Sequence, residues 1–179
     1  KPLPAKAWDR SDRILHCSSF SKCLVPGFRI GWLAAGKHAR TIQRLQLMST
    51  LSTSSPMQLA LVDYLSTRRY DVHLRRLRRQ LAERKQQAWQ LLLRHLPADV
   101  KIHHNNSGYF LWLELPESMD AGELTAQALA HQISIAPGKM FSTSDTWKRF
   151  FRFNTAWQWG ESEESAVKQL GQLIREQLK

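Results

Sequence analysis

The most informative part of the chain reads Ser18-Ser19-Phe20-Ser21-Lys22, followed shortly by Pro26-Gly27-Phe28-Arg29-Ile30-Gly31-Trp32. The apolar run at 13–17 comes directly before it and predicts a strand buried on both faces. Residues 18–27 end on a Pro-Gly pair, which is typical of a turn, and residues 28–35 predict a second strand. The sequence therefore places Lys22 in a loop between two strands, with Arg29 near the start of the second.

The residue types around this loop suit an amine nucleophile beside a phosphate ester. Hydroxyl groups from Ser18, Ser19 and Ser21 stand next to Lys22, and Arg29 follows seven residues later. Hydroxyls and a guanidinium bind phosphate, and a partly desolvated lysine can lose its proton and form an imine with an aldehyde. Such a set could hold pyridoxal phosphate (PLP). A polar loop with an exposed lysine and an ion-paired arginine has the same composition, and spacing alone favours that interpretation, because serine-rich loops with a lysine are common.

Composition narrows the class of protein. The chain has 179 residues, 42% of them hydrophobic, which allows a folded core. Lys and Arg number 26 against 15 Asp and Glu, so the net charge of +11 permits an anionic partner without specifying a site. Two cysteines, Cys17 and Cys23, exclude a disulfide scaffold. We expect a cytoplasmic protein without a membrane span, and, because the chain starts at Lys1 rather than Met, a piece of a longer polypeptide.

The rest of the pattern divides into three parts. Helices are predicted at about 37–48 and from Ser55 to Leu65. A long helix at 71–96 spans nearly 40 Å at about 1.5 Å per residue, which suggests a bridge between a first part, 1–70, and a second, 97–179. Its apolar positions recur at helical spacing: Leu74, Leu77, Leu81, Ala88, Leu91 and Leu92. The second part has an α+β pattern, with strands at 100–104, 109–115, 133–136 and 150–154 and helices at 121–131 and 161–178.

Three segments, in this order, carry a resemblance to a known family. The loop that contains Lys22 and Arg29 resembles the lysine segment of fold-type I PLP-dependent aminotransferases. Its residue sequence is most similar to that of the aminotransferase-like domain of MocR-type regulators of the GntR family. Ser107-Gly108-Tyr109-Phe110-Leu111-Trp112-Leu113 resembles the glycine-aromatic strand of the family's small domain, and Phe150-Phe151-Arg152-Phe153-Asn154 resembles its late arginine strand. The resemblance implies an α/β fold: the tail of the large domain at 1–70, the bridging helix at 71–96 and the small domain at 97–179.

The resemblance also implies roles for individual residues. Lys22 would be the catalytic amine that bonds to PLP, Ser19 and Arg29 would hold the cofactor phosphate, and Ser21 is a further candidate. Arg152 would bind the α-carboxylate of a substrate or effector, since a guanidinium can donate two parallel hydrogen bonds. A strand arginine paired with a nearby carboxylate is the alternative for Arg152. Pro137-Gly138 would shape a loop near the site, although a plain turn explains it equally well.

Part of the family's site lies upstream of Lys1. The Asp that pairs with the pyridine nitrogen, the Asn and Tyr near the ring hydroxyl, and a glycine-rich turn that also holds the phosphate all precede this segment in the family. We therefore expect this chain alone to bind PLP weakly or not at all.

Three functions remain open. The first is the PLP-binding sensor region of a MocR-type transcriptional regulator, homodimeric, responsive to an amino acid or amine, and bound to DNA only through an N-terminal winged helix that this chain lacks. The second is part of a genuine aminotransferase, which transfers amino groups between an α-amino acid and a 2-oxo acid. The third is an interaction module with an inactive site.

Two other features have plainer interpretations. The arginines and lysine between 68 and 85 form a basic run that we interpret as the solvated face of the long helix rather than as a DNA contact. His103-His104 lacks a third ligand at useful spacing, so we expect no metal there.

Overall fold

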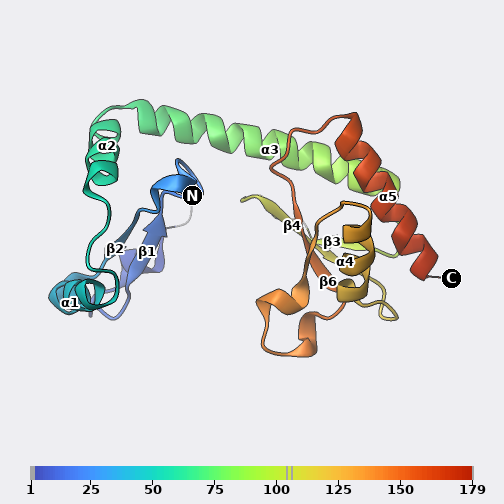
Figure 1. Ribbon diagram of the computed structural model, residues 1–179, viewed down its shortest axis with the longest axis horizontal. Helices are drawn as coiled ribbons and strands as arrows, with labels where there is room; N and C mark the ends of the chain where they lie inside the picture. Colours follow the sequence, from blue (N-terminus) through green and yellow to red (C-terminus); the bar gives the residue numbers. More distant parts are fainter. Residues whose placement is uncertain (1–2, 104, 106, 179) are drawn as a thin grey trace. The chain divides into compact units, whose positions relative to one another are not determined.

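The computed structural model describes residues 3–103, 105 and 107–178. These residues form two compact units, which divide between Leu77 and Arg78. The division falls within α3 (Arg69–His95), the long helix drawn in green in Figure 1. The assignment of 71–96 as a separate bridging segment between 1–70 and 97–179 stays a prediction.

The first unit contains a two-stranded antiparallel ribbon and helices. Strands β1 (His16–Ser19) and β2 (Gly31–Ala34) pair with Ser19 opposite Gly31. Three short 3-10 helices, Ala5–Trp8, Pro26–Phe28 and Gly36–His38, precede or join these strands and the helix that follows. Helices α1 (Ala39–Thr50) and α2 (Ser55–Leu65) lead into the first turns of α3, and the proline in the first turn of α2 agrees with the predicted start.

Both predicted strands of this unit are displaced. The sequence predicts the first at 13–17 with both faces buried, but β1 begins at His16, and Cys17, Ser18 and Ser19 are exposed. In the part of the chain that the structure describes, β1 pairs only with β2, so no further layer buries it. The second strand starts at Gly31 rather than at 28, because a 3-10 turn and a left-handed Arg29 (φ 54°) come first.

The first unit buries little apolar surface. Its buried hydrophobic residues are Ile30, Ala35 and Leu61. Large apolar side chains on its helices are exposed, among them Leu45, Leu47, Met48, Leu59 and Val62. A globular unit normally buries such side chains, so this surface lacks the layer that a complete core would supply.

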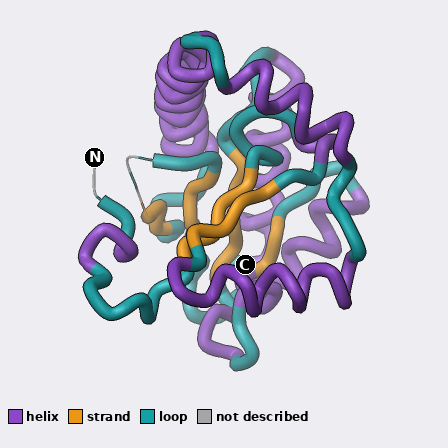
Figure 2. Tube along the Cα trace, turned by 90° about the vertical axis from the view of Figure 1, so that its left-hand side faces the viewer, coloured by secondary structure: helices purple, strands orange, loops and turns teal. Residues whose placement is uncertain are grey.

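The second unit is an antiparallel sheet with helices packed on it. The strands are β3 (Lys101–His103), β4 (Phe110–Glu114), β5 (Ala136–Pro137) and β6 (Phe150–Asn154), in the spatial order β3-β4-β6-β5. Helices α4 (Ala121–Ala130) and α5 (Glu161–Gln177) follow β4 and β6. Figure 2 shows strands in orange and helices in purple. The strand expected at 133–136 begins only at Ala136, because the Ile133 N–H bonds to the Ala128 carbonyl and closes the C-terminal end of α4 instead of pairing with a strand.

The two faces of this sheet differ in chemistry. Alternate residues on β4 and β6 face a core that includes parts of α3, α4 and α5: Leu111, Leu113, Phe151, Phe153, Ala88, Leu92, Leu124 and Leu170. The opposite face carries Phe110, Trp112, Glu114, Phe150 and Arg152. The sequence alternation thus separates a packed face from a face of rings and charges.

The helix ends follow the sequence signals. Asp120 caps α4 by accepting a hydrogen bond from the Gly122 N–H at 2.6 Å, directly before the predicted helix start at 121. At the start of α5, the Gly160 N–H donates to Glu163 Oε2 at 3.1 Å. Across the described residues, no helix combines the length and the apolar character that a membrane crossing needs.

Candidate functional site

The loop that carries Lys22 is a tight turn with defined backbone bonds. The N–H groups of Cys23, Leu24 and Val25 all approach the Phe20 carbonyl, at 3.3, 2.9 and 3.2 Å. The Phe20 N–H donates to the Ile30 carbonyl at 3.1 Å, which extends the β1–β2 pairing by one residue. Lys22 therefore lies in an exposed turn directly after β1.

The structure brings the predicted phosphate-binding groups together. Ser19 Oγ accepts a hydrogen bond from the Ser21 N–H at 3.0 Å and lies 3.5 Å from the Ile30 carbonyl. Arg29 Nη1 donates to Ser21 Oγ at 3.3 Å, so the guanidinium reaches back across the turn. The left-handed backbone of Arg29 reverses the chain direction at this point. Ser19, Ser21 and Arg29 thus form one cluster, and Lys22 adjoins Ser21 in the chain.

This cluster fits the phosphate of PLP. The Arg29 guanidinium donates to a neutral hydroxyl, and no described carboxylate forms an ion pair with it. Lys22 is exposed, as the alternative of a plain polar loop expects. Two hydroxyls and an uncompensated cation are the donor set that a phosphate monoester requires. The serine and arginine side chains are therefore compatible with a phosphate group, and their role in binding one stays a prediction.

Residues in the first turns of α3 contact the Lys22 loop, and these contacts were not predicted from the sequence. His73 Nε2 lies 2.7 Å from the Cys23 carbonyl, and Tyr70 Oη lies 3.6 Å from Cys23 Sγ. The rings of Tyr70 and Phe20 meet edge to face with 6.1 Å between centroids. These contacts join residues about fifty positions apart, and no local pattern in the sequence predicts them.

Arg152 lies at the centre of β6, on the sheet face away from the core. It is opposite Trp112 on one side and Ala136 on the other. Its Cζ lies 4.1 Å from the Phe110 ring centroid and 4.4 Å from that of Phe141, so two aromatic rings hold the guanidinium. No described carboxylate forms an ion pair with it, which rules out the paired-arginine alternative within the described residues.

A neighbouring acidic group is already satisfied by other cations. Glu114, which is 8% exposed, bonds to His103 Nε2 at 2.9 Å and to Arg149 Nη2 at 2.7 Å, and Lys101 Nζ lies 3.7 Å away. The hydrogen bond from His103, together with the charges of Lys101 and Arg149, holds the pKa of Glu114 below its ordinary value despite burial. Glu114 is therefore paired with Arg149, and none of the carboxylates that the structure describes forms an ion pair with Arg152.

His103 has this structural role, and His104 lies outside the described residues. Within residues 3–103, 105 and 107–178, no group of three metal-binding side chains occurs.

The Pro137-Gly138 pair shapes the loop that supplies Phe141. A Cβ at the buried Gly138 would collide with the Trp147 carbonyl, so this backbone approach requires glycine. Lys139 pairs with Asp145 at 3.3 Å across the loop. The loop therefore brings the Phe141 ring to Arg152, and its proximity to the cofactor site stays a prediction.

Comparison with known proteins gives the family. The sequence profile for aminotransferase class I and II matches residues 5–165. The uncharacterized HTH-type transcriptional regulator YdcR of Escherichia coli is 85% identical over 178 residues, which cover 99% of this chain and 38% of YdcR.

Solved structures agree with this match. The crystal structure of a multiple substrate aminotransferase from Thermococcus profundus superposes with a TM-score of 0.90 at 27% identity, over 98% of this chain and 44% of that one. LysN, the α-aminoadipate aminotransferase of Thermus thermophilus, superposes with a TM-score of 0.83 at 27% identity, over 92% of this chain and 42% of LysN. The chain thus spans less than half the length of each relative, and it belongs to the aminotransferase class I and II family, of which it has the C-terminal part of the fold-type I architecture.

Proposed function

We propose that this chain is the C-terminal part of the PLP-binding sensor domain of a MocR-type transcriptional regulator. The observation that carries the proposal is the 85% identity with an HTH-type regulator along nearly the whole chain. The aligned region is the aminotransferase-like part of that relative, so DNA binding would belong to a winged helix outside this chain. Such a regulator would work in the cytoplasm.

The cofactor would bind in the first unit. LysN was solved with N-(5'-phosphopyridoxyl)-L-leucine, which supports PLP as the group for this family member as well. When bound, PLP supplies an aldehyde that condenses with amines and a conjugated ring that withdraws electrons. Ser19, Ser21 and Arg29 would bind the phosphate, and the Lys22 amine would hold the cofactor covalently.

Arg152 would bind the α-carboxylate of an amino-acid effector. A guanidinium held by two rings, without a described acidic partner, keeps its charge for a ligand. Because a planar guanidinium donates paired hydrogen bonds, it orients a carboxylate as well as attracting it. The effector would change DNA binding only if it binds one domain arrangement better than the other.

The unburied apolar surface of the first unit supports the view that the site is incomplete here. Side chains such as Leu45, Leu47 and Leu59 would pack against the remainder of a large domain. A homodimer is the assembly we propose for the whole protein.

A genuine aminotransferase is the second candidate, favoured by the superposition on the Thermococcus profundus enzyme. There Lys22 Nζ would also carry the proton removed from the substrate Cα.

The test that separates the two candidate functions uses a full-length protein that carries this chain. A regulator should show PLP-dependent and amino-acid-dependent binding to its own promoter DNA, lost in Lys22→Ala. Steady conversion of an amino acid and a 2-oxo acid, without any DNA response, would instead support the enzyme.

A further inference from the structure

Lys85 on α3 is buried at a position where the sequence suggested a solvated basic face. Lys85 is 5% exposed, whereas the nearby residues Glu83 and Gln86 are exposed. Burial lowers the pKa of the Lys85 ammonium below its ordinary value, since desolvation disfavours the charged form. A lysine is rarely buried to this degree unless its charge is satisfied by specific partners.

Three oxygens satisfy the Lys85 ammonium, and all three are neutral. Nζ lies 2.6 Å from the Ser107 carbonyl, 2.7 Å from Asn105 Oδ1 and 3.4 Å from the Asn105 carbonyl. An ammonium has three N–H donors, so this set uses its full capacity. No described carboxylate pairs with Lys85, and the interaction is therefore directed at the connection between β3 and β4.

Arg84, the residue before Lys85 on α3, bonds to the segment that follows β6. Its Nη1 donates to the Ala156 carbonyl at 2.7 Å, just beyond the end of β6. Between the two attachments, the buried Thr155 donates its N–H and its hydroxyl to the Tyr109 carbonyl, at 2.8 and 3.0 Å. Two consecutive cations of α3 thus hold the segment entering β4 and the segment leaving β6, which bond to each other.

This end of the sheet carries one of the two rings that contact the Arg152 guanidinium. Phe110 is the first residue of β4, and it pairs with Asn154, two residues beyond Arg152. The Phe110 ring is the closer of the two rings that hold the guanidinium, at 4.1 Å. A shift of the chain before Phe110 would move that ring and release one side of Arg152.

We propose that Lys85 is a positioning residue for Arg152: by binding Asn105 and Ser107 it fixes the entry into β4, and so it holds the Phe110 ring against the guanidinium. A merely structural lysine would add stability to the second unit without affecting this contact. The consequence for ligand binding rests on the proposed function, because it requires that Arg152 binds a carboxylate. The position of the guanidinium does not depend on that function.

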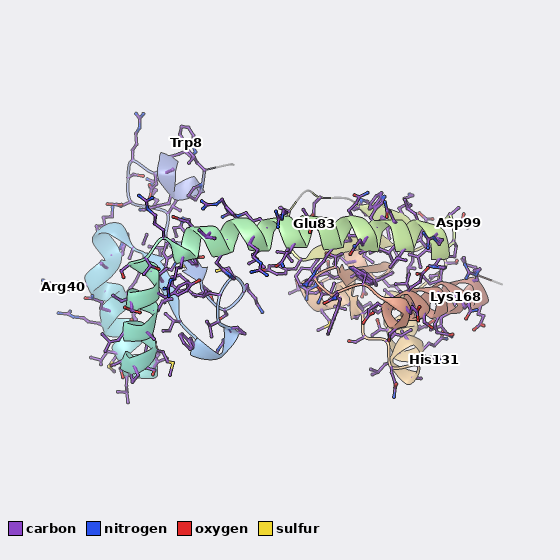
Figure 3. The ribbon with its side chains drawn as sticks, turned by 90° about the horizontal axis from the view of Figure 1, so that it is seen from above. Trp8, Arg40, Glu83, Asp99, His131 and Lys168 are labelled. Carbon is purple, nitrogen blue, oxygen red and sulfur yellow. The ribbon has the colours of Figure 1, made fainter. Side chains whose placement is uncertain are left out.

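The first measurement uses the 179-residue chain labelled with ¹⁵N at arginine. In the wild type, ring currents should place the Arg152 Nε–Hε resonance away from those of exposed arginines, and Arg152→Lys identifies the signal by its loss. Lys85→Met should move the resonance towards the exposed arginines. The matched control is Lys168→Met, because Lys168 is an exposed lysine on α5 (Figure 3), and it should leave the resonance in place.

A second variant keeps the test decisive if Lys85→Met does not fold. Asn105→Ala removes one acceptor from an exposed residue, leaves the core intact and should move the resonance in the same direction by less. If either variant folds with an otherwise native spectrum and the Arg152 resonance does not move, the positioning role is refuted.

The ligand measurement separates this role from the proposed function. In a full-length protein loaded with PLP, Lys85→Met should weaken amino-acid binding about tenfold through misplacement of the guanidinium. If the resonance moves and the affinity does not change, Lys85 still positions Arg152, and the carboxylate role of Arg152 is the claim that fails.

Discussion

Arg29 Nη1 lies 3.3 Å from the hydroxyl oxygen of Ser21, so the guanidinium reaches across the turn that contains Lys22. The same Ser21 donates its backbone N–H to Ser19 Oγ. Hydrogen bonds therefore join Ser19, Ser21 and Arg29, which span eleven positions of the sequence, and Lys22 follows Ser21 in the chain. This arrangement is the structural basis for assigning a cofactor phosphate to the first unit.

Replacing Arg29 by alanine should weaken PLP binding by about tenfold or more, because a charge-assisted hydrogen bond to phosphate contributes roughly 1.5–3 kcal/mol. The measurement is a PLP titration of a full-length protein, followed by absorbance. The control is Arg40→Ala, since Arg40 is an exposed arginine on α1 (Figure 3) and takes no part in the hydrogen bonds that join Ser19, Ser21 and Arg29. Equal PLP affinities for the two variants would remove Arg29 from the phosphate site.

The 179-residue chain by itself should not hold PLP. The first unit leaves much apolar surface exposed, and the proposed function assigns further cofactor-binding residues to a part of the protein outside this chain. After incubation with PLP and borohydride, we expect no stoichiometric mass increase on Lys22. A full increment would show that the serines, Arg29 and Lys22 suffice without the rest of a large domain.

The Glu114 network should make the second unit sensitive to acid. Because the folded state lowers the pKa of Glu114, the stabilisation is present above the ordinary carboxyl pKa and is lost as pH falls through the lower folded value. Wild type should be more stable than Glu114→Gln at pH 7, and the difference should shrink as the pH falls below about 4. Urea unfolding across this range measures it, and a difference that does not depend on pH would contradict the role of the charge.

Gly171 of α5 lies against the last residue of α3, His95. A Cβ at this position would collide with the His95 carbonyl, so Gly171→Ala should destabilise the second unit by about 1–3 kcal/mol. Gly27→Ala is the control, since a Cβ there meets nothing within 4 Å. Thermal unfolding of the two variants measures the effect. An unchanged midpoint temperature for Gly171→Ala would contradict the prediction, because it would mean that α5 and α3 accommodate the added methyl group without a loss of stability.

The sequence predicted the second unit well because its signals are local. Alternating residues in β4 and β6, the Asp120 cap and the periodicity of α5 each reflect contacts within one element or between adjacent strands. The first unit was less predictable. The apolar residues before Lys22 indicate a buried strand, but within the described chain no other layer covers β1.

The residues that hold the site in place were harder to foresee. Lys85 belongs to a run of basic residues, and only the packing of α3 on the β3–β4 connection distinguishes it from the exposed arginines nearby. The Phe110 and Phe141 contacts with Arg152 join three separate segments. For Phe110, the alternation along β4 was the available signal, since it places this ring on the same face as Arg152.

Covalent capture of the cofactor by Lys22 tests the account most directly. A full-length protein that carries this chain is incubated with PLP, reduced with borohydride, digested and analysed by mass spectrometry, with Lys22→Ala as the parallel sample. We predict one phosphopyridoxyl group per chain, on Lys22, and none in the variant. An unmodified Lys22, or a label on another lysine that persists in Lys22→Ala, would contradict the assignment of this loop as the cofactor site.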